Sequence, residues 1–335
     1  MRVLYVKPYP GELDIARKAL PECTFIPTDS IDAVESFTAE SVDALCVFVD
    51  TTVDRALIDR FPKLSAIITR STGFDHIDTV YAKERGITVS NVPRYGSQTV
   101  AEYAFALIFA LSRNAFNAYT DMLRRTIVTD LERYEGFDLS KKVLGVVGTG
   151  AIGAHVCKIA GGLDMEVRAF DVYPNEQIAA LPHVTYVSLP DLLQQSDIVT
   201  LHVPSNPQTH HLIDAKMLAL MKKSAYLINT ARGEVIDTPA LVRALRTKKL
   251  AGAALDVLEG ERELHDEAEL LEGEGRVAER WRVLVADYML VDMPNVIVTP
   301  HIAFNTREAK REILDTTIAN IRACASGAPQ NRVLT

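Results

Sequence analysis

Three glycines, Gly148, Gly150 and Gly153, follow an apolar run at residues 143–147 and precede a helical pattern. In a tight strand-to-helix turn the first glycine supplies the backbone angles, the second lets an anionic ligand approach, and the third lets the helix pack closely. The N-terminus of the helix adds N–H groups that bind a pyrophosphate. The spacing therefore predicts a dinucleotide-binding turn, with a purely structural glycine turn as the alternative.

Asp171 follows the next predicted strand, residues 166–170, and lies 171 − 153 = 18 residues after Gly153. An acid at this distance accepts hydrogen bonds from the ribose hydroxyls of a dinucleotide. It also repels a 2′-phosphate, and residues 171–175 contain no Arg or Lys that would bind one. The sequence therefore favours NAD over NADP, with an ordinary exposed acid at a strand end as the alternative.

Two series of short β-rich runs alternate with helical patterns, the first over residues 3–91 and the second over residues 142–299. Such alternation is typical of parallel sheets with crossover helices, and a length of 335 residues favours two domains. We therefore predict the α/β class with two doubly wound parallel-sheet domains. An amphipathic helix over residues 307–325 could return the chain to the first domain.

Composition argues against several classes of protein. The chain has 36 Lys and Arg against 44 Asp and Glu, a net charge of −8, with 48% apolar residues. We expect a soluble protein that binds neither nucleic acid nor a membrane, because both attract a basic face. The N-terminal residues do not resemble a secretory signal, and the cysteines are too scattered for a disulfide framework. We therefore expect a cytoplasmic protein with reduced thiols. These cysteines are Cys23, Cys46, Cys157 and Cys324.

Charged side chains directly follow three predicted strands of the second series. Arg232 follows residues 225–229, whereas Asp256 and His301 follow the two strands after it. Ligands of an open α/β sheet bind beyond the carboxyl ends of its strands. If the strands are parallel, these side chains share one edge of the sheet with the glycine turn.

This combination fits hydride transfer between a nicotinamide and a 2-keto or 2-hydroxy acid. Arg232 can bind the carboxylate and polarise the carbonyl, and His301 can exchange a proton near neutral pH. A carboxylate must orient the imidazole, and Asp256, Glu259 and Glu261 are candidates. Taken alone, the arginine could instead form a structural ion pair, and the histidine could be a turn residue.

Two further features carry structural interpretations. His210 and His211 are adjacent, and because adjacent residues rarely face one ion we predict no metal site. Residues 259–287 are acidic and helix-prone, and we expect a solvated or subunit-contacting insertion there. The sequence assigns no role to the acidic insertion over residues 262–290.

At these residues the chain closely resembles the D-isomer-specific 2-hydroxyacid dehydrogenases, and the resemblance covers nearly the whole sequence. Its most specific segments are residues 70–78, 91–102, 148–153, 201–204, 228–233, 255–261 and 299–306. The resemblance implies a Rossmann NAD-binding domain at residues 100–301. It also implies a flavodoxin-like substrate domain made of residues 1–99 and 302–335.

The resemblance also assigns roles to individual residues. It implies catalytic roles for Arg232, Glu261 and His301, with Glu261 as the partner of the histidine. Asp256 would hold the nicotinamide carboxamide. Residues that would bind the substrate are Ser71, Thr72 and Gly73, through their backbone amides, with Tyr95 and Phe304 lining its pocket. Cofactor contacts would come from Gly148, Gly150, Ala151, Ile152, Gly153, Asp171, Val203, Pro204, Thr209, Thr230, Ala231 and Asp256.

Tyr95 and the segment at residues 301–306 look like the D-lactate dehydrogenase branch of the family. The expected activity is reduction of pyruvate to D-lactate with NADH, in a homodimer. Hydroxypyruvate, glyoxylate, phenylpyruvate or a branched 2-keto acid stay open as substrates. An NAD(H)-sensing interaction protein, similar to corepressors that share this fold, is the alternative from another class.

Overall fold

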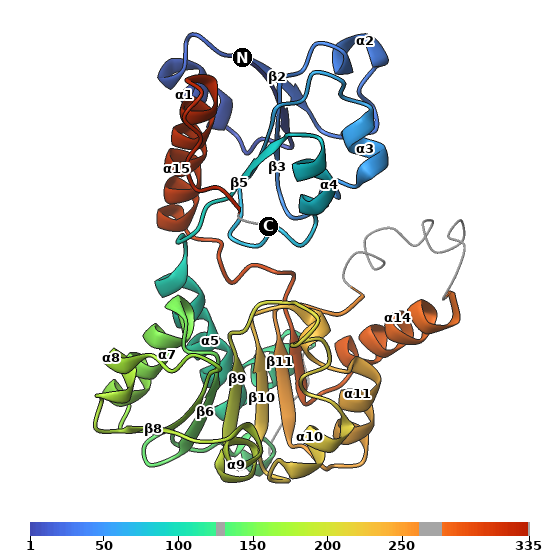
Figure 1. Cartoon of the computed structure of the whole chain (residues 1–335). Coiled ribbons are helices and arrows are strands. Elements are labelled where there is room, and N and C mark those ends of the chain that lie inside the picture. The colour runs from blue at the N-terminus through green and yellow to red at the C-terminus, as the bar shows by residue number, and fades with distance from the viewer. Residues whose placement is uncertain (125–130, 261–276, 334–335) are drawn as a thin grey trace. The chain divides into compact units, whose positions relative to one another are not determined.

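The computed structural model describes residues 1–124, 131–260 and 277–333, and the chain divides into two compact units (Figure 1). The first unit contains Met1–Gly96 and Thr306–Thr335, and the second contains Ser97–Asn305. Each unit is built on its own parallel sheet. Across the described ranges, no helix has both the length and the apolar composition needed to cross a bilayer.

The first unit has a five-stranded sheet in the order β2-β1-β3-β4-β5, with every pairing parallel. This order is that of flavodoxin-like folds. The strands are β1 (Arg2–Val6), β2 (Thr24–Thr28), β3 (Ala44–Val47), β4 (Ala66–Thr69) and β5 (Thr88–Ser90). The helices are α1 (Glu12–Ala19), α2 (Ser36–Ala39), α3 (Arg55–Asp59), α4 (Thr79–Glu84) and α15 (Arg307–Ala325).

The second unit has a seven-stranded parallel sheet in the order β12-β11-β10-β9-β6-β7-β8. Counted from β6, this is the 3-2-1-4-5-6 order of dinucleotide-binding folds with one strand added. The strands are β6 (Val143–Val147), β7 (Glu166–Phe170), β8 (Val184–Tyr186), β9 (Ile198–Leu201), β10 (Tyr226–Asn229), β11 (Gly252–Leu255) and β12 (Val296–Val298). The helices are α5 (Ser97–Ser112), α6 (Ala115–Leu123), η1 (Leu131–Tyr134), α7 (Ala151–Gly162), α8 (Glu176–Ala179), α9 (Leu189–Gln195), α10 (Ala215–Leu220), η2 (Gly233–Val235), α11 (Thr238–Arg246) and α14 (Val277–Val291).

Both sheets are buried on both faces. Successive residues of a strand point to opposite faces of the sheet, and in both units the residues on each face pack against helices. In the second unit Leu227 packs with α9, α10 and α11, whereas the next residue, Ile228, packs with α5 and α7. In the first unit Leu4 packs with α3 and α4, whereas Tyr5 packs with α1 and α15. The C-terminal helix α15 thus completes the core of the first unit, as its amphipathic pattern allowed.

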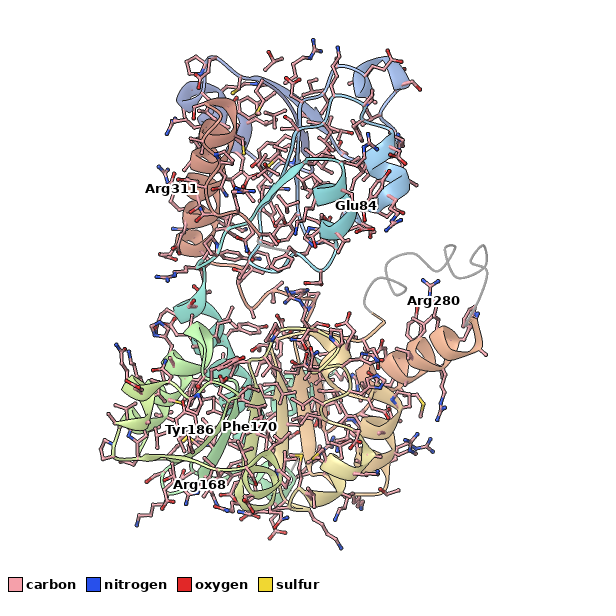
Figure 2. All side chains as sticks on the ribbon, in the orientation of Figure 1. Glu84, Arg168, Phe170, Tyr186, Arg280 and Arg311 are labelled. Atoms are coloured by element: carbon pink, nitrogen blue, oxygen red, sulfur yellow. The ribbon has the colours of Figure 1, made fainter. Side chains whose placement is uncertain are left out.

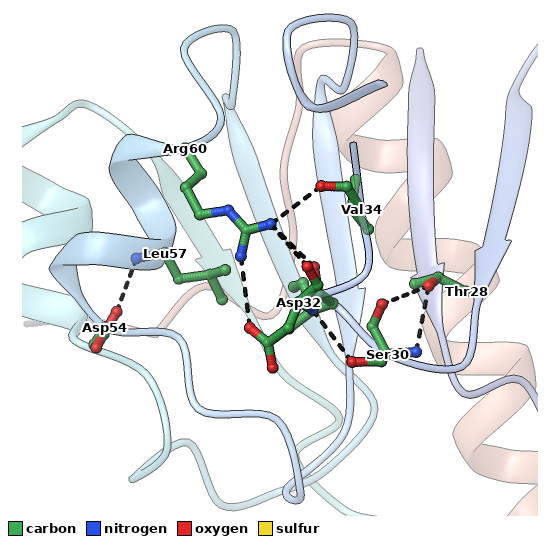
Figure 3. A network of polar contacts seen from close by, with 8 residues as sticks. Thr28, Ser30, Asp32, Val34, Asp54, Leu57 and Arg60 are labelled. Carbon is green, nitrogen blue, oxygen red and sulfur yellow. Dashed lines mark hydrogen bonds and ion pairs between the residues drawn. The ribbon is translucent and has the colours of Figure 1, made fainter. Parts of the chain in front are cut away.

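Arg60, which follows α3, ties that helix to the loop after β2 (Figure 3). Its Nη2 donates to the carbonyl oxygens of Ile31, Asp32 and Val34 at 3.2–3.4 Å, and Nη1 lies 3.5 Å from the Asp32 carboxylate. One guanidinium therefore satisfies three carbonyls of a loop that has no ladder partner of its own.

The predicted fold class, with a Rossmann-type and a flavodoxin-like sheet, is confirmed by these two strand orders. Strand β8 was not predicted; only one of its three residues is fully buried. The expectation of a solvated or subunit-contacting insertion is wrong for the buried part of residues 259–287. Leu284 and Asp287 of α14 are almost fully buried, because this half of the helix packs against α11.

Candidate active site

Arg232, Asp256 and His301 come from three neighbouring strands of the second unit. They follow β10, β11 and β12, which lie side by side in parallel, so all three emerge at the carboxyl edge of the sheet. The glycine turn follows β6 at the same edge. The structure thus brings the candidate anion-binding, acid–base and cofactor groups to the place where open α/β sheets bind ligands.

Each of the three glycines in the turn has a different structural role. Gly148 has φ +92°, and a Cβ there would meet the His202 carbonyl oxygen at 2.7 Å. A Cβ at Gly153 would overlap the carbonyl of Gly148, so the helix can pack this closely only without a side chain. Gly150 has open space at its Cβ and directly precedes α7, whose first N–H groups it leaves accessible to an anion. These are the features required for a pyrophosphate site.

Asp171 lies at the end of β7, and its carboxylate is held by the glycine turn. Its Oδ2 accepts hydrogen bonds from the Thr149 N–H at 2.6 Å and the Thr149 hydroxyl at 3.1 Å, and Oδ1 accepts from Tyr173 N–H. The Tyr186 hydroxyl donates to the Thr149 oxygen at 2.7 Å. Figure 2 labels Tyr186 on β8 and Phe170, which directly precedes Asp171. Neither Thr149 nor Tyr186 was predicted as functional. Tyr186 lies on β8, which was not recognised, and Thr149 lies in the glycine turn, where the spacing argument gave a role only to the glycines.

His301 has a left-handed backbone with φ +51°, which is uncommon for a residue other than glycine. Its N–H donates to the Asp256 carbonyl at 2.9 Å, and its ring meets the Phe304 ring edge-on with centroids 6.4 Å apart. Backbone strain of this kind concentrates at functional sites when neighbouring contacts impose it. Here the contacts come from the buried Asp256.

The Asp256 carboxylate accepts three hydrogen bonds from the segment around His301. Oδ1 accepts from the Thr299 hydroxyl at 2.6 Å and Ile302 N–H at 3.0 Å, and Oδ2 accepts from Ala303 N–H at 2.8 Å. Burial raises the pKa of the Asp256 carboxyl, and these hydrogen bonds offset part of the rise. In the structure this side chain therefore shapes the backbone of the histidine loop.

The three carboxylates considered as partners of His301 are in different situations. Asp256 is engaged by the backbone of the histidine loop, and Glu259 bonds His211 at 2.6 Å. Glu261, the partner implied by the family resemblance, lies outside the described residues. Its assignment as the catalytic carboxylate stays a prediction.

Arg232 is half-buried after β10, and its backbone is fixed by a neighbouring amide. Asn229 Nδ2 donates to the Arg232 carbonyl at 2.8 Å, while Asn229 Oδ1 accepts from Ala231 N–H at 3.0 Å. Arg232 Nη1 donates to the Ala231 carbonyl at 2.7 Å. The adjacent Thr230 hydroxyl is buried and has no hydrogen-bond partner in the described part of the chain. A bound cofactor could supply that partner.

The remaining predicted cofactor positions lie at the same edge. Ala151 and Ile152 open α7, and Val203 and Pro204 follow β9. Thr209 uses its hydroxyl to donate to the Pro204 carbonyl at 2.6 Å, which fixes the loop after β9. Within the described residues, no group of three or more His, Cys, Asp or Glu side chains could hold a metal.

The predicted substrate loop belongs to the first unit and follows β4. The Ser71 hydroxyl donates to the Gly73 carbonyl at 2.6 Å, and the Thr72 hydroxyl donates to the Val92 carbonyl at 2.8 Å. With both hydroxyls turned into the protein, the backbone amides are the donors left to face an anion. Tyr95 follows β5 and lines a pocket with residues that include Arg94.

Arg70 anchors the start of this loop. It is 1% exposed, and Nη1 donates to Glu12 at 2.9 Å while Nη2 donates to the Val6 and Lys7 carbonyls at 2.7 and 3.0 Å. Sequence alone gave no sign of this role, because the partners of the arginine lie about sixty residues away in the chain.

A Rossmann-type sheet with a glycine turn, an acid at the end of its second strand, and an arginine and a histidine at the same edge is the arrangement expected of a dinucleotide-dependent oxidoreductase. The family model described as D-isomer specific 2-hydroxyacid dehydrogenase, NAD binding domain, matches residues 105–303. The chain belongs to the D-isomer-specific 2-hydroxyacid dehydrogenase family. It is an NAD-dependent enzyme that acts on the CH–OH group of 2-hydroxy acids, which confirms the family resemblance, the enzyme class and the cofactor inferred from the sequence.

Relatives with assigned names span several substrates. The chain is 34% identical to a glycerate dehydrogenase of Methylorubrum extorquens, with 93% of this chain and 90% of the relative covered. It is 35% identical to a D-lactate dehydrogenase of Escherichia coli, with 87% and 85% covered. The crystal structure of Aquifex aeolicus D-lactate dehydrogenase with NAD and lactic acid matches at a TM-score of 0.87 and 33% identity, covering 97% and 96%.

Proposed function

We propose that this enzyme reduces pyruvate to D-lactate with NADH and catalyses the reverse reaction. The observation that carries the proposal is the carboxyl edge of the second sheet, where Arg232 and His301 follow strands separated only by β11. The Phe304 ring against His301 supplies an apolar wall suited to a methyl group. The similarity to the Aquifex D-lactate dehydrogenase adds support.

In the proposed mechanism the protein binds, polarises and protonates the keto acid. Arg232 pairs with the carboxylate and draws electron density from the carbonyl oxygen. Bound NADH supplies the hydride. His301, with Glu261 as its predicted partner, donates a proton to the carbonyl oxygen, and in the reverse direction the neutral imidazole removes the hydroxyl proton.

We assign the cofactor contacts to the residues named above at the carboxyl edge of the second unit. The first unit, with its C-terminal helix α15, is assigned as the substrate domain. There the amides of Ser71, Thr72 and Gly73 would bind the substrate carboxylate, and Tyr95 would limit the size of its side chain.

A cytoplasmic homodimer is proposed as the working form. Helix α6 exposes several large apolar side chains, namely Phe116, Tyr119, Met122 and Leu123, which are 47–73% exposed. Adjoining apolar residues of this kind mark protein–protein contact surfaces. They lie just after the long helix α5, which also exposes Phe109.

The test is turnover of NADH with a panel of 2-keto acids: pyruvate, hydroxypyruvate, glyoxylate, phenylpyruvate and a branched acid. The proposal expects the highest kcat/KM with pyruvate. Because His301 transfers the proton, His301→Ala should lower kcat at least ~10²-fold with NADH affinity intact. Arg232→Ala should damage both KM and kcat.

Other outcomes would redirect the assignment. If kcat/KM is higher with hydroxypyruvate or glyoxylate than with pyruvate, that acid is the assigned substrate instead. Tight NADH binding with no turnover of any keto acid would overturn the catalytic proposal and favour an NAD(H)-sensing interaction protein.

A further inference from the structure

His211 and Glu259 form a histidine–carboxylate pair at the carboxyl edge, separate from the proposed catalytic histidine. His211 Nε2 lies 2.6 Å from Glu259 Oε1, and the glutamate side chain is only 10% exposed. Its other oxygen accepts a hydrogen bond from Thr238 N–H at 3.2 Å, at the start of α11. The helix N-terminus favours a negative charge at this position. Both carboxylate oxygens are therefore satisfied within the protein.

The backbone of His211 is joined to the segment that follows Arg232. His211 N–H donates to the Glu234 carbonyl at 2.8 Å, and Ile213 N–H donates to the Val235 carbonyl at 3.0 Å. Glu234 and Val235 belong to η2, for which Arg232 is the N-cap residue. Displacing the segment that contains His211 would therefore displace the arginine loop.

The backbone of Glu259 is fixed from two further sides. A Cβ at Gly233 would overlap the backbone of Leu258 and Glu259, so the two chain segments touch directly. Gly260 N–H donates to the Asp287 carboxylate at 2.8 Å, and this aspartate is fully buried on α14. Glu261 is the next residue in the chain.

An ordinary surface ion pair contributes little to the placement of the backbone. This pair differs because Glu259 is nearly buried and joins three segments: the loop after β9, the start of α11 and the loop after β11. Truncating His211 would leave one oxygen of a buried carboxylate without its donor, which destabilises that arrangement. The loop after β11 would then shift to regain a partner.

We propose that His211 and Glu259 are positioning residues that hold the loop after β11 in fixed register with the arginine loop, and so keep Arg232 in place relative to the residues that follow β11. They act through the backbone and do not touch the reacting atoms. The inference rests on the proposed function and extends it to two residues outside the catalytic set.

The neighbouring His210 provides a matched control. Its ring stacks on that of His211 with centroids 4.0 Å apart, but it is exposed, and the bond to Glu259 is made by His211. His211→Ala should lower kcat ~10-fold or more while NADH affinity stays within ~2-fold, because only the relation between catalytic groups changes. His210→Ala should retain wild-type kinetics. His211→Gln, which keeps a donor near the position of Nε2, should recover part of the loss.

Three measurements separate positioning from simple loss of fold. The primary deuterium isotope effect on kcat with 4-deuterated NADH should increase in His211→Ala, because the chemical step becomes slower. Glu259→Gln, which keeps an acceptor oxygen, should be milder than Glu259→Ala. Amide hydrogen exchange should become faster at residues 233–236 and 258–260 in His211→Ala and stay unchanged in His210→Ala.

The exchange measurement needs no substrate, so it decides the proposal even if the wild-type enzyme turns over none of the keto acids. That result would overturn the proposed function alone. The positioning role is overturned if exchange at both segments is the same in the two histidine variants. It is also overturned if an active wild type and His211→Ala share one kcat and one isotope effect.

Discussion

The Thr299 hydroxyl donates a 2.6 Å hydrogen bond to the Asp256 carboxylate, which joins the end of β12 to the end of β11. The same carboxylate accepts from the backbone N–H groups of Ile302 and Ala303, the two residues that directly follow His301. The family resemblance implies contact of Asp256 with the nicotinamide carboxamide. The geometry gives this residue a second task, which is to hold the histidine in its left-handed conformation.

Asp256→Asn should therefore impair catalysis even when NADH still binds. An asparagine presents one NH2 group where a carboxylate oxygen accepted a backbone N–H, so at least one donor of the histidine loop loses its partner. We expect kcat to fall ~10-fold or more and the free energy of unfolding to fall by about 1–3 kcal/mol. Steady-state kinetics and urea unfolding measure the two effects.

The exposed Asp292→Asn is the control for this variant, since it removes a similar charge from the end of α14. Loss of NADH affinity with an unchanged kcat would assign Asp256 to the carboxamide contact alone.

Cofactor choice should depend on a residue that does not touch the cofactor. The Tyr186 hydroxyl donates to Thr149, which in turn donates to Asp171, so the tyrosine helps to hold the Asp171 carboxylate in its orientation. Tyr186→Phe should weaken NADH binding about fivefold, which corresponds to the net free energy of one hydrogen bond. It should also reduce the preference of the enzyme for NADH over NADPH. Asp171→Ala should narrow it much further.

Fluorescence titration with both reduced cofactors gives the two affinities. Tyr226→Phe is the control, because that ring stacks on Phe137 and lies at the beginning of β10, away from the carboxyl edge. If the ratio of NADH affinity to NADPH affinity is unchanged in Asp171→Ala, Asp171 does not contact the ribose.

The architecture and the edge of the site could be predicted because they depend on patterns along the chain. Alternating β-rich and helical runs predict parallel strands, and parallel strands place Arg232, Asp256 and His301 at one edge. The glycine spacing and Asp171 likewise predict the dinucleotide turn from local chemistry. None of these inferences needs the contacts of a particular side chain.

Choosing among neighbouring carboxylates could not be done in this way. Asp256 and Glu259 lie three residues apart, yet one is engaged by the histidine loop and the other by His211. These choices depend on which loop folds back on which, and one residue of register changes the outcome. The left-handed φ of His301 follows from the same contacts and leaves no trace in the residue types.

The stability of the second unit should decline as the pH falls below about 6.5, the ordinary pKa of a histidine in an unfolded chain. Burial lowers the pKa of His202 to about 3, so the folded protein keeps the ring neutral while the unfolded chain takes up a proton. The contribution is therefore complete above pH 6.5 and is lost progressively toward pH 3. The stability lost between neutral pH and pH 5 amounts to about 2 kcal/mol at most.

Urea unfolding at pH 7 and pH 5 should show this slope, and His202→Asn should reduce it. The ring Nε2 bonds Thr200 Oγ1 at 2.9 Å, so Thr200→Val serves as a variant that loses the same contact but not the titrating group. A wild-type slope in His202→Asn would show that other groups cause the acid sensitivity.

Replacing Arg70 should be among the most destabilising changes in the first unit. Its guanidinium pairs with Glu12 at 2.9 Å and lies 4.9 Å from the centre of the Tyr5 ring, fully enclosed. Arg70→Met would leave the Glu12 carboxylate buried without its cation, which costs about 3–5 kcal/mol. The substrate loop begins one residue later, so KM for the keto acid should also rise, whereas NADH affinity should stay unchanged.

Arg311→Ala is the matched control. Arg311 lies on α15 (Figure 2), and its pairing with Asp315 is solvent-exposed and should contribute little. The double variant Arg70→Met with Glu12→Gln separates the two causes, because removing both charges relieves the uncompensated carboxylate while the loop anchor stays absent. We expect the double variant to regain stability but not the wild-type KM. Recovery of both would show that the arginine serves stability alone.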